Sequence, residues 1–93
     1  MLVGVCQIEM LLPACGSLKE KRLILNSVKD KIGNKFNVSI AEVDHQELWQ
    51  RSILGMALVT NEKKLIDQVF NKILEFLYGQ DRLEVLEHNV EIY

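Results

Sequence analysis

The sequence predicts one α+β domain in which strand, helix, strand, strand, helix and strand follow one another over all 93 residues. Two observations lead to this prediction. Apolar residues alternate with polar ones along the strand segments and recur at helical spacing along the helix segments. Each helical segment also begins with a residue type that caps helices. A chain this short has room for a single hydrophobic core, so residues 1–93 are expected to form one domain.

Residues 2–12 are predicted to form the first strand. Their even positions are apolar apart from Gly4, whereas the odd positions become polar at Gln7 and Glu9. This alternation is typical of a strand with one buried face. Residues 13–16 then connect the strand to the first helix.

The first helix is predicted to run from Ser17 to about Gly33. Ser17 and Glu20 form a capping box, in which the Ser17 hydroxyl accepts from the Glu20 N–H and the Glu20 carboxylate accepts from the Ser17 N–H. Gly33 followed by Asn34 is a typical helix end. Apolar residues at helical spacing predict one buried side, made of Leu18, Ile24, Leu25, Val28 and Ile32.

The next two strands are predicted at residues 36–43 and 51–60. The first of these alternates, whereas the second is apolar at nearly every position between Ile53 and Val59. A strand that is apolar at both odd and even positions is typical of a central strand covered on both faces. The polar residues 44–50 are expected to form a long hairpin connection between them.

Asn61 is predicted to cap the second helix, and Gly79 is predicted to end it. A wide apolar stripe runs along this helix through Leu65, Ile66, Val69, Phe70, Ile73, Leu74 and Leu77. Residues 83–92 alternate again and predict the fourth strand. Two strand–helix–strand crossovers joined by a hairpin give the ferredoxin-like βαββαβ sandwich, in which two helices cover one face of a four-stranded antiparallel sheet.

The composition is that of a globular protein, with 48% apolar and 26% charged residues. The net charge of −2 does not favour a generic nucleic-acid binder. Met1 leads directly into a strand pattern without signal-peptide features, and no stretch approaches the length of a membrane span, so we expect a cytoplasmic protein that does not bind membranes. Cys6 and Cys15 lack the spacing of a metal or redox site and are expected to be free thiols.

The sequence lacks the motifs of several common chemistries. There is no Walker loop, no G-x-G-x-x-G fingerprint and no G-x-S-x-G elbow. His45 and His88 have no partner at metal-ligand spacing. The open faces of the first and third strands carry no aromatic residue, so bases are not expected to stack on the sheet. We therefore expect no cofactor, no metal and no catalytic residue.

Basic side chains on the first helix form a candidate anion- or RNA-binding site, made of Lys19, Lys21, Arg22 and Lys29. Cations in a first turn oppose the helix dipole, which favours acidic side chains there. Phosphate groups bind readily at helix N-termini beside cations. Helical geometry places Lys21 within the apolar stripe and the other three to one side of it. A solvated amphipathic face is the alternative interpretation.

The hairpin supplies candidate partner-binding residues, namely Glu42, Trp49, Gln50 and Arg51. A lone tryptophan beside an arginine is a typical contact pair for a partner. A small-molecule sensor or enzyme using residues 44–51 is the alternative, with His45 paired to Asp44 or Glu47. In a purely structural alternative, Leu48 packs under the sheet edge together with the tryptophan.

Several blocks of the chain together resemble the YlxP-like family of small bacterial proteins, a domain of unknown function. The blocks are Ser17–Arg22, Phe36–Val43, Leu48–Arg51, Leu54–Ala57 and Asn61, and the resemblance covers essentially the whole chain. It implies a ferredoxin-like fold and a cytoplasmic bacterial protein. It also implies a tie to translation or ribosome assembly, because genes of this family often lie among translation and RNA-maturation genes. It supplies no catalytic residue.

The first interpretation is a non-enzymatic binding module that contacts structured RNA or a ribonucleoprotein through the first helix and the hairpin. A protein–protein interaction module is a further alternative. Val3 and Val5 lie on the strand face away from the helices, so the sequence also predicts a symmetric homodimer, sheet to sheet or through an edge strand. In the competing monomer, the long side chains of Gln7, Glu9 and Arg51 screen the sheet.

Overall fold

A computed structural model describes all 93 residues, which form one four-stranded antiparallel sheet and two helices. The elements in chain order are β1 (Leu2–Leu11), α1 (Leu18–Lys35), β2 (Ser39–Asp44), β3 (Arg51–Thr60), α2 (Lys63–Tyr78) and β4 (Glu84–Ile92). The strand order is β2-β3-β1-β4, which places β1 and β3 in the centre and β2 and β4 at the edges. The predicted α+β class and βαββαβ order are confirmed.

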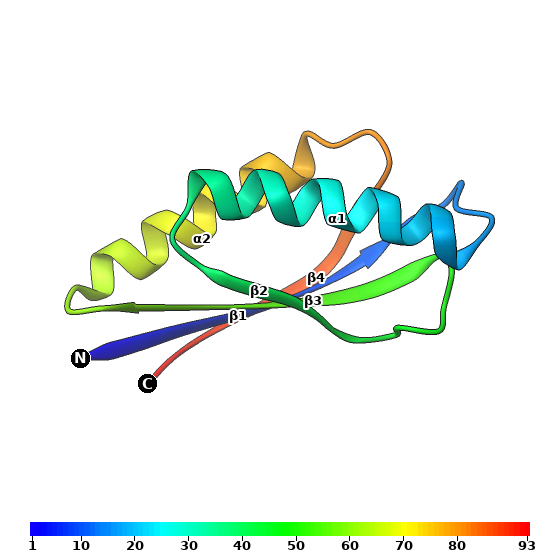
Figure 1. The fold of residues 1–93 in the computed structure, drawn as a ribbon. Coiled ribbons are helices and arrows are strands. Elements are labelled where there is room, and N and C mark those ends of the chain that lie inside the picture. The colour runs from blue at the N-terminus through cyan, green and yellow to red at the C-terminus, as the bar shows by residue number, and fades with distance from the viewer.

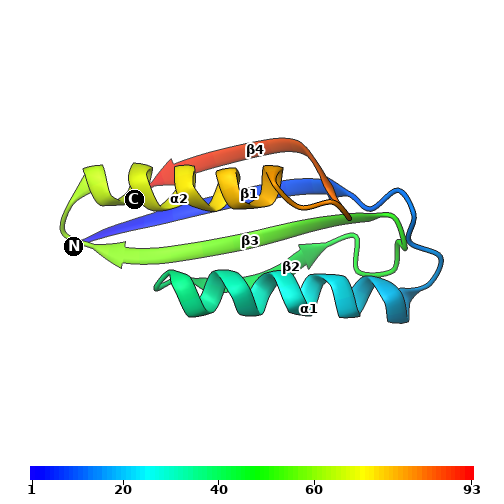
Figure 2. The same ribbon diagram turned by 90° about the horizontal axis from the view of Figure 1, so that it is seen from above.

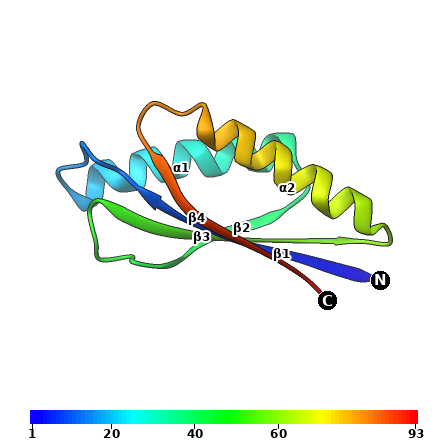
Figure 3. The ribbon, with the colours of Figure 1, turned by 180° about the vertical axis from the view of Figure 1, so that it is seen from behind.

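Both helices lie on the same face of the sheet, and no element covers the other face (Figures 1 and 3). From above, α1 runs along the β2 side and α2 along the β1 and β4 side (Figure 2). The two termini lie together at one end, where Val3 and Tyr93 exchange two backbone hydrogen bonds of 2.9 Å. The connection between β2 and β3 lies at the opposite end, beside the first turn of α1 (Figure 1).

The central strand β1 pairs antiparallel with β3 on one side and with β4 on the other, as the crossover pattern predicts. Two register shifts interrupt this regular pairing. One lies on the β4 side between Glu9 and Met10, and the other lies in β2 between Glu42 and Asp44. Bulges re-aim side chains at the ends of strands. The second shift stands directly before the β2–β3 connection and changes the direction in which that connection leaves the sheet.

The core lies between the sheet and the helices. Alternate residues of β1 and β3 and one stripe of each helix supply most of its 18 buried apolar side chains. Gly4 permits close packing, since a Cβ there would lie 2.5 Å from Ile66 Cγ2. The Gly4 position of β1 is therefore where α2 approaches the sheet backbone directly.

Two predicted boundaries on α1 and β2 were wrong. α1 continues past Gly33 to Lys35, and the N–H of Phe36 still donates to the carbonyl of Ile32 at 2.8 Å. Gly33 does not adopt a positive φ, so it does not end the helix. β2 begins at Ser39 rather than at residue 36. The three residues after α1 carry the chain from the helix layer down to the sheet edge before pairing begins.

Two further predictions, on α2 and β3, need correction. Glu62, not Asn61, occupies the cap position of α2, and it makes no side-chain cap hydrogen bond. Its N–H instead bonds the Thr60 hydroxyl at 3.1 Å. β3 is central as predicted, but only one of its faces is covered. Its odd-numbered side chains point to the open face, where Val59 is 63% exposed.

Cys6 and Cys15 are both buried free thiols, as the sequence predicted. Burial raises the pKa of the Cys6 thiol to about 11. Neither helix combines the length and the apolar character that crossing a membrane requires.

Candidate functional site

The candidate site is the β2–β3 connection, residues 45–50, which we call the 45–50 loop. It lies at the end of the sheet where α1 begins (Figure 1). Its conformation is set from three sides: by Lys21 of α1, by Glu9 of β1 and by the connector before α1. These three sets of contacts together decide which side chains the loop presents outward.

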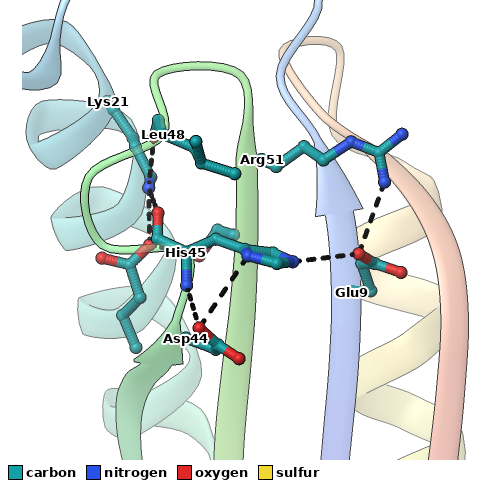
Figure 4. A network of polar contacts seen from close by, with 8 residues as sticks. Glu9, Lys21, Asp44, His45, Leu48 and Arg51 are labelled. Atoms are coloured by element: carbon teal, nitrogen blue, oxygen red, sulfur yellow. Dashed lines mark hydrogen bonds and ion pairs between the residues drawn. The ribbon is translucent and has the colours of Figure 1, made fainter.

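Lys21 reaches the loop from the neighbouring helix α1 (Figure 4). Its Nζ donates to the backbone carbonyls of His45 and Leu48, both at 2.6 Å, and lies 2.8 Å from Glu42 Oε2. The side chain is only 1% exposed. An ammonium group has three N–H donors, and these three partners use all of them. The His45 carbonyl also accepts from the Leu48 N–H at 3.0 Å, whereas the Leu48 carbonyl has Lys21 as its protein partner. Both carbonyls are therefore fixed to α1.

The charge of Lys21 is matched by Glu42 at the end of β2. The same Glu42 oxygen also accepts from the hydroxyl of Ser52, at 2.7 Å, and Ser52 is fully buried on β3. No buried side-chain nitrogen or oxygen lacks a hydrogen-bond partner. A buried ion pair persists only when its remaining hydrogen-bonding capacity is satisfied in this way. Lys21, Glu42 and Ser52 thus connect α1, β2 and β3 beneath the loop.

Helical spacing explains why a lysine reaches this position. Lys21 lies three, four and seven residues before Ile24, Leu25 and Val28, so it shares the buried side of α1 with them. The prediction that Lys21 lies within the apolar stripe is confirmed. Its aliphatic stem continues the core, and its charged end reaches the carbonyls at the rim.

His45 holds the other side of the loop. It is the only residue with a positive φ, 63°, and its N–H donates to Asp44 Oδ1 at 2.7 Å. Its Nε2 lies 3.3 Å from Glu9 Oε2, and Arg51 Nη1 donates to the same oxygen at 3.4 Å. Figure 4 shows the imidazole and the guanidinium turned toward this one carboxylate. The strained backbone of His45 is therefore supported by contacts to β1.

Gln50 joins the end of the loop to the connector before α1. Its Nε2 donates to the carbonyls of Pro13, at 3.4 Å, and Cys15, at 3.3 Å. Its own carbonyl accepts from the N–H of Leu12 at 2.8 Å. Gln50 was predicted as a partner-binding residue, and the structure places it in internal hydrogen bonds that link two neighbouring loops.

Two apolar side chains of the loop remain exposed. Leu48 is 46% exposed and Trp49 is 53% exposed. They border a surface hollow of about 680 Å³ that is also lined by Leu11, Glu47, Gln50 and Arg51. The structural alternative, in which both pack under the sheet edge, does not describe this arrangement. The internal hydrogen bonds of the loop hold an apolar pair toward solvent.

The basic side chains of α1 divide into different environments. Lys19 and Arg22 are exposed on the first turns of α1, and Lys29 is half-buried farther along the helix. Lys21 is a correction to the predicted anion site, because its three donors are used within the protein. The capping box forms in modified form, since Ser17 Oγ accepts from the Glu20 N–H but the Glu20 carboxylate accepts from the N–H of Gly16.

Two residues that help to hold the 45–50 loop in place, Ser52 and Glu9, were not predicted from the sequence as part of the site. Ser52 was passed over, although a polar residue at a core-facing position of a strand is itself a signal. Glu9 was considered only as a polar residue of the first strand that screens the sheet, and its pairing with His45 depends on residues 36 positions apart. No group of three or more His, Cys, Asp or Glu side chains gathers in a way that could hold a metal ion.

Comparisons with known proteins agree with the predicted resemblance. The model of a family described as "Protein of unknown function (DUF503)" matches residues 3–90. The chain is 36% identical over 83 residues to the "Uncharacterized protein YlxP" of Bacillus subtilis (strain 168), covering 89% of this chain and 90% of that protein. Among solved structures, the de novo designed protein Foldit4 superposes with a TM-score of 0.59 at 13% identity, over 100% of this chain and 97% of the other, which shows a shared fold only. The chain belongs to the DUF503 family of proteins of unknown function.

Proposed function

We propose that this protein is a non-enzymatic binding module that contacts structured RNA, alone or within a ribonucleoprotein, through the 45–50 loop and the first turn of α1. The observation behind the proposal is the exposed pair Leu48 and Trp49 on a loop that a buried lysine holds in place. A fixed loop loses little conformational entropy when it binds, so its exposed aromatic ring can act as a preformed contact.

RNA is the ligand class that the neighbouring charges favour. Lys19 and Arg22 are exposed on the first turns of α1, next to the loop. An aromatic ring stacks on unpaired bases, while cations beside it neutralise backbone phosphates. The acidic strand β4 forms the edge of the sheet opposite the edge along which α1 runs, so its carboxylates lie away from this surface (Figure 2). The family's association with translation and RNA-maturation genes points in the same direction.

Trp49 provides a direct test, because it is the only tryptophan in the chain. An RNA hairpin with a single-stranded loop, added at low salt, is expected to quench Trp49 emission as a base stacks on the ring. Trp49→Ala should weaken binding, measured by anisotropy of labelled RNA, by about 5- to 150-fold, since base–aromatic stacking is worth about 1–3 kcal/mol. Absence of RNA binding at low salt would overturn the proposal.

The basic side chains are tested by salt dependence. Changing Lys19 and Arg22 together to Gln should reduce the log–log salt slope by about 0.7–0.9 for each phosphate that these side chains neutralise. Lys63→Gln with Lys64→Gln is the matched control, because both lysines are exposed on α2 at the other end of the molecule. An equal reduction in the control pair would mean that binding is non-specific. Capture from lysate that resists nuclease would instead favour a protein partner.

A small-molecule site in residues 44–51 is the second candidate. The hollow of about 680 Å³ beside Trp49 and the close approach of His45 to Glu9 favour it. A small ligand there should quench Trp49 without RNA, and this quenching should persist in the Lys19→Gln, Arg22→Gln variant. Loss of quenching in that variant would count against the small-molecule candidate.

A further inference from the structure

The open face of the sheet is apolar in its centre and has no covering element. Its apolar side chains come from the odd-numbered positions of three neighbouring strands, namely Val3, Val5, Ala41, Val43, Ile53, Ala57 and Val59. Val43 extends this surface over Gly55, where a Cβ would lie 2.8 Å from Val43 Cγ1. The strands form one apolar strip that runs along β1 and β3 and continues onto β2.

We propose that this face binds the same face of a second copy of the chain. Strands about 4.8 Å apart, rising about 3.3 Å per residue, give a four-stranded face of about 600 Å². A standard interface buries about 800 Å² on each partner. The accessible area of a sheet face is larger than this flat estimate, because side chains protrude from it. The whole open face is therefore the size that a homodimer needs, whereas a smaller partner would leave part of the strip in water.

The charges on the face also suit a second copy. The central strip has no net charge, since Glu9 is the only carboxylate on β1 and Arg51 donates to it at 3.4 Å. Acidic side chains lie at both edges of the face, at Glu87 and Glu91 of β4 and at Asp44 of β2, which pairs with Ile53. The apolar strip between these edges carries no unpaired charge, so the strips of two copies can meet without burying one. The dimer itself does not depend on the proposed RNA function, so the two can fail separately.

Sedimentation equilibrium tests the dimer. The untagged protein should approach twice the chain mass of 10.7 kDa as its concentration rises. Val59→Glu should return the mass to one chain, because it places a charge in the apolar strip. Leu23→Glu is the matched control, since Leu23 on α1 is 64% exposed and Val59 on β3 is 63% exposed. The control should remain dimeric.

Two outcomes would overturn the proposal. A mass of one chain at every concentration rules out the dimer. A dimer that survives both Val59→Glu and Ala57→Glu, with circular dichroism unchanged, moves the interface to another surface. Ala57→Glu on the same strand also replaces Val59→Glu if that variant fails to fold.

Discussion

The two helices cover the same face of the sheet but bury different chemistry. α2 buries only apolar side chains, namely Ile66, Phe70, Ile73, Leu74 and Leu77. α1 buries the apolar Ile24, Leu25, Val28 and Ile32, and it also buries Lys21. Apolar burial is non-directional, whereas hydrogen bonds from an ammonium group fix the positions of their acceptors. The comparison shows that α2 is held by packing, and that the first turns of α1 also fix the geometry of a loop.

Stability alone does not account for the buried lysine. Removing an ion pair from water has a large cost, and well-packed apolar residues often replace such a pair without loss of stability. What an apolar side chain does not supply is a donor for the carbonyls of His45 and Leu48. Those carbonyls belong to the loop that presents Trp49. The polar contacts of α1 therefore serve the same surface to which we assign partner binding.

The largest expected effect on stability comes from replacing Lys21, the polar residue that α1 buries and α2 lacks. Lys21→Met keeps the aliphatic bulk but leaves the Glu42 carboxylate without its cation and the Leu48 carbonyl without its donor, so unfolding free energy should fall by about 3–5 kcal/mol. Urea denaturation measures it. Trp49 emission should also change, because the loop loses its attachment to α1.

Lys19→Met is the control for this change, since Lys19 lies on the exposed side of the same turn. It should alter the unfolding free energy by no more than about 0.5 kcal/mol. Equal stabilities for the Lys19 and Lys21 variants would contradict the structural role assigned to Lys21.

A smaller effect compares the two helix caps. Ser17 Oγ accepts from the Glu20 N–H at 3.1 Å, whereas Glu62 at the start of α2 makes no side-chain cap bond. Ser17→Ala should therefore cost about 0.5–2 kcal/mol. Glu62→Ala should cost less, because it removes no cap hydrogen bond. Thermal melts of the two variants measure both losses of stability. A larger loss for Glu62→Ala than for Ser17→Ala would contradict the assignment of Ser17 as the stronger cap.

The last effect is absent at neutral pH and concerns Cys6, a buried ionisable group that has no ionic partner of the kind that Lys21 has in Glu42. Its folded pKa is raised to about 11 from an ordinary value of 9.0. Above pH 9 the unfolded thiol loses its proton while the folded thiol keeps it, so stability should fall as the pH rises from about 9 to about 11. Below pH 9 this contribution is fully present.

Cys6→Ala removes that contribution. Its unfolding free energy, measured by urea denaturation from about pH 8 to about pH 11, should decline less steeply than that of the native sequence. The other titrating groups are common to both proteins and cancel in the difference. Parallel curves would mean that Cys6 stays protonated in both the folded and the unfolded state across this range.

The sequence by itself determined the order and type of every element, the antiparallel pairing of β1 with β3 and β4, and the free state of both cysteines. It also placed Lys21 on the buried side of α1. These features follow from periods of 2 and 3.6 residues, which any segment expresses through its nearest neighbours in the chain. Element ends were less well determined, as Gly33 and Asn61 illustrate, because a helix continues or stops according to its packing as well as its local sequence.

Only the tertiary structure decided what the candidate residues do. Lys21 bonds carbonyls 24 and 27 positions away, and His45 approaches a carboxylate 36 positions away. No local pattern encodes such distances, because they depend on how two crossovers bring separate segments to one end of the sheet. The same arrangement uses the donors of Lys21 within the protein rather than at the predicted phosphate site, and it leaves Leu48 and Trp49 exposed.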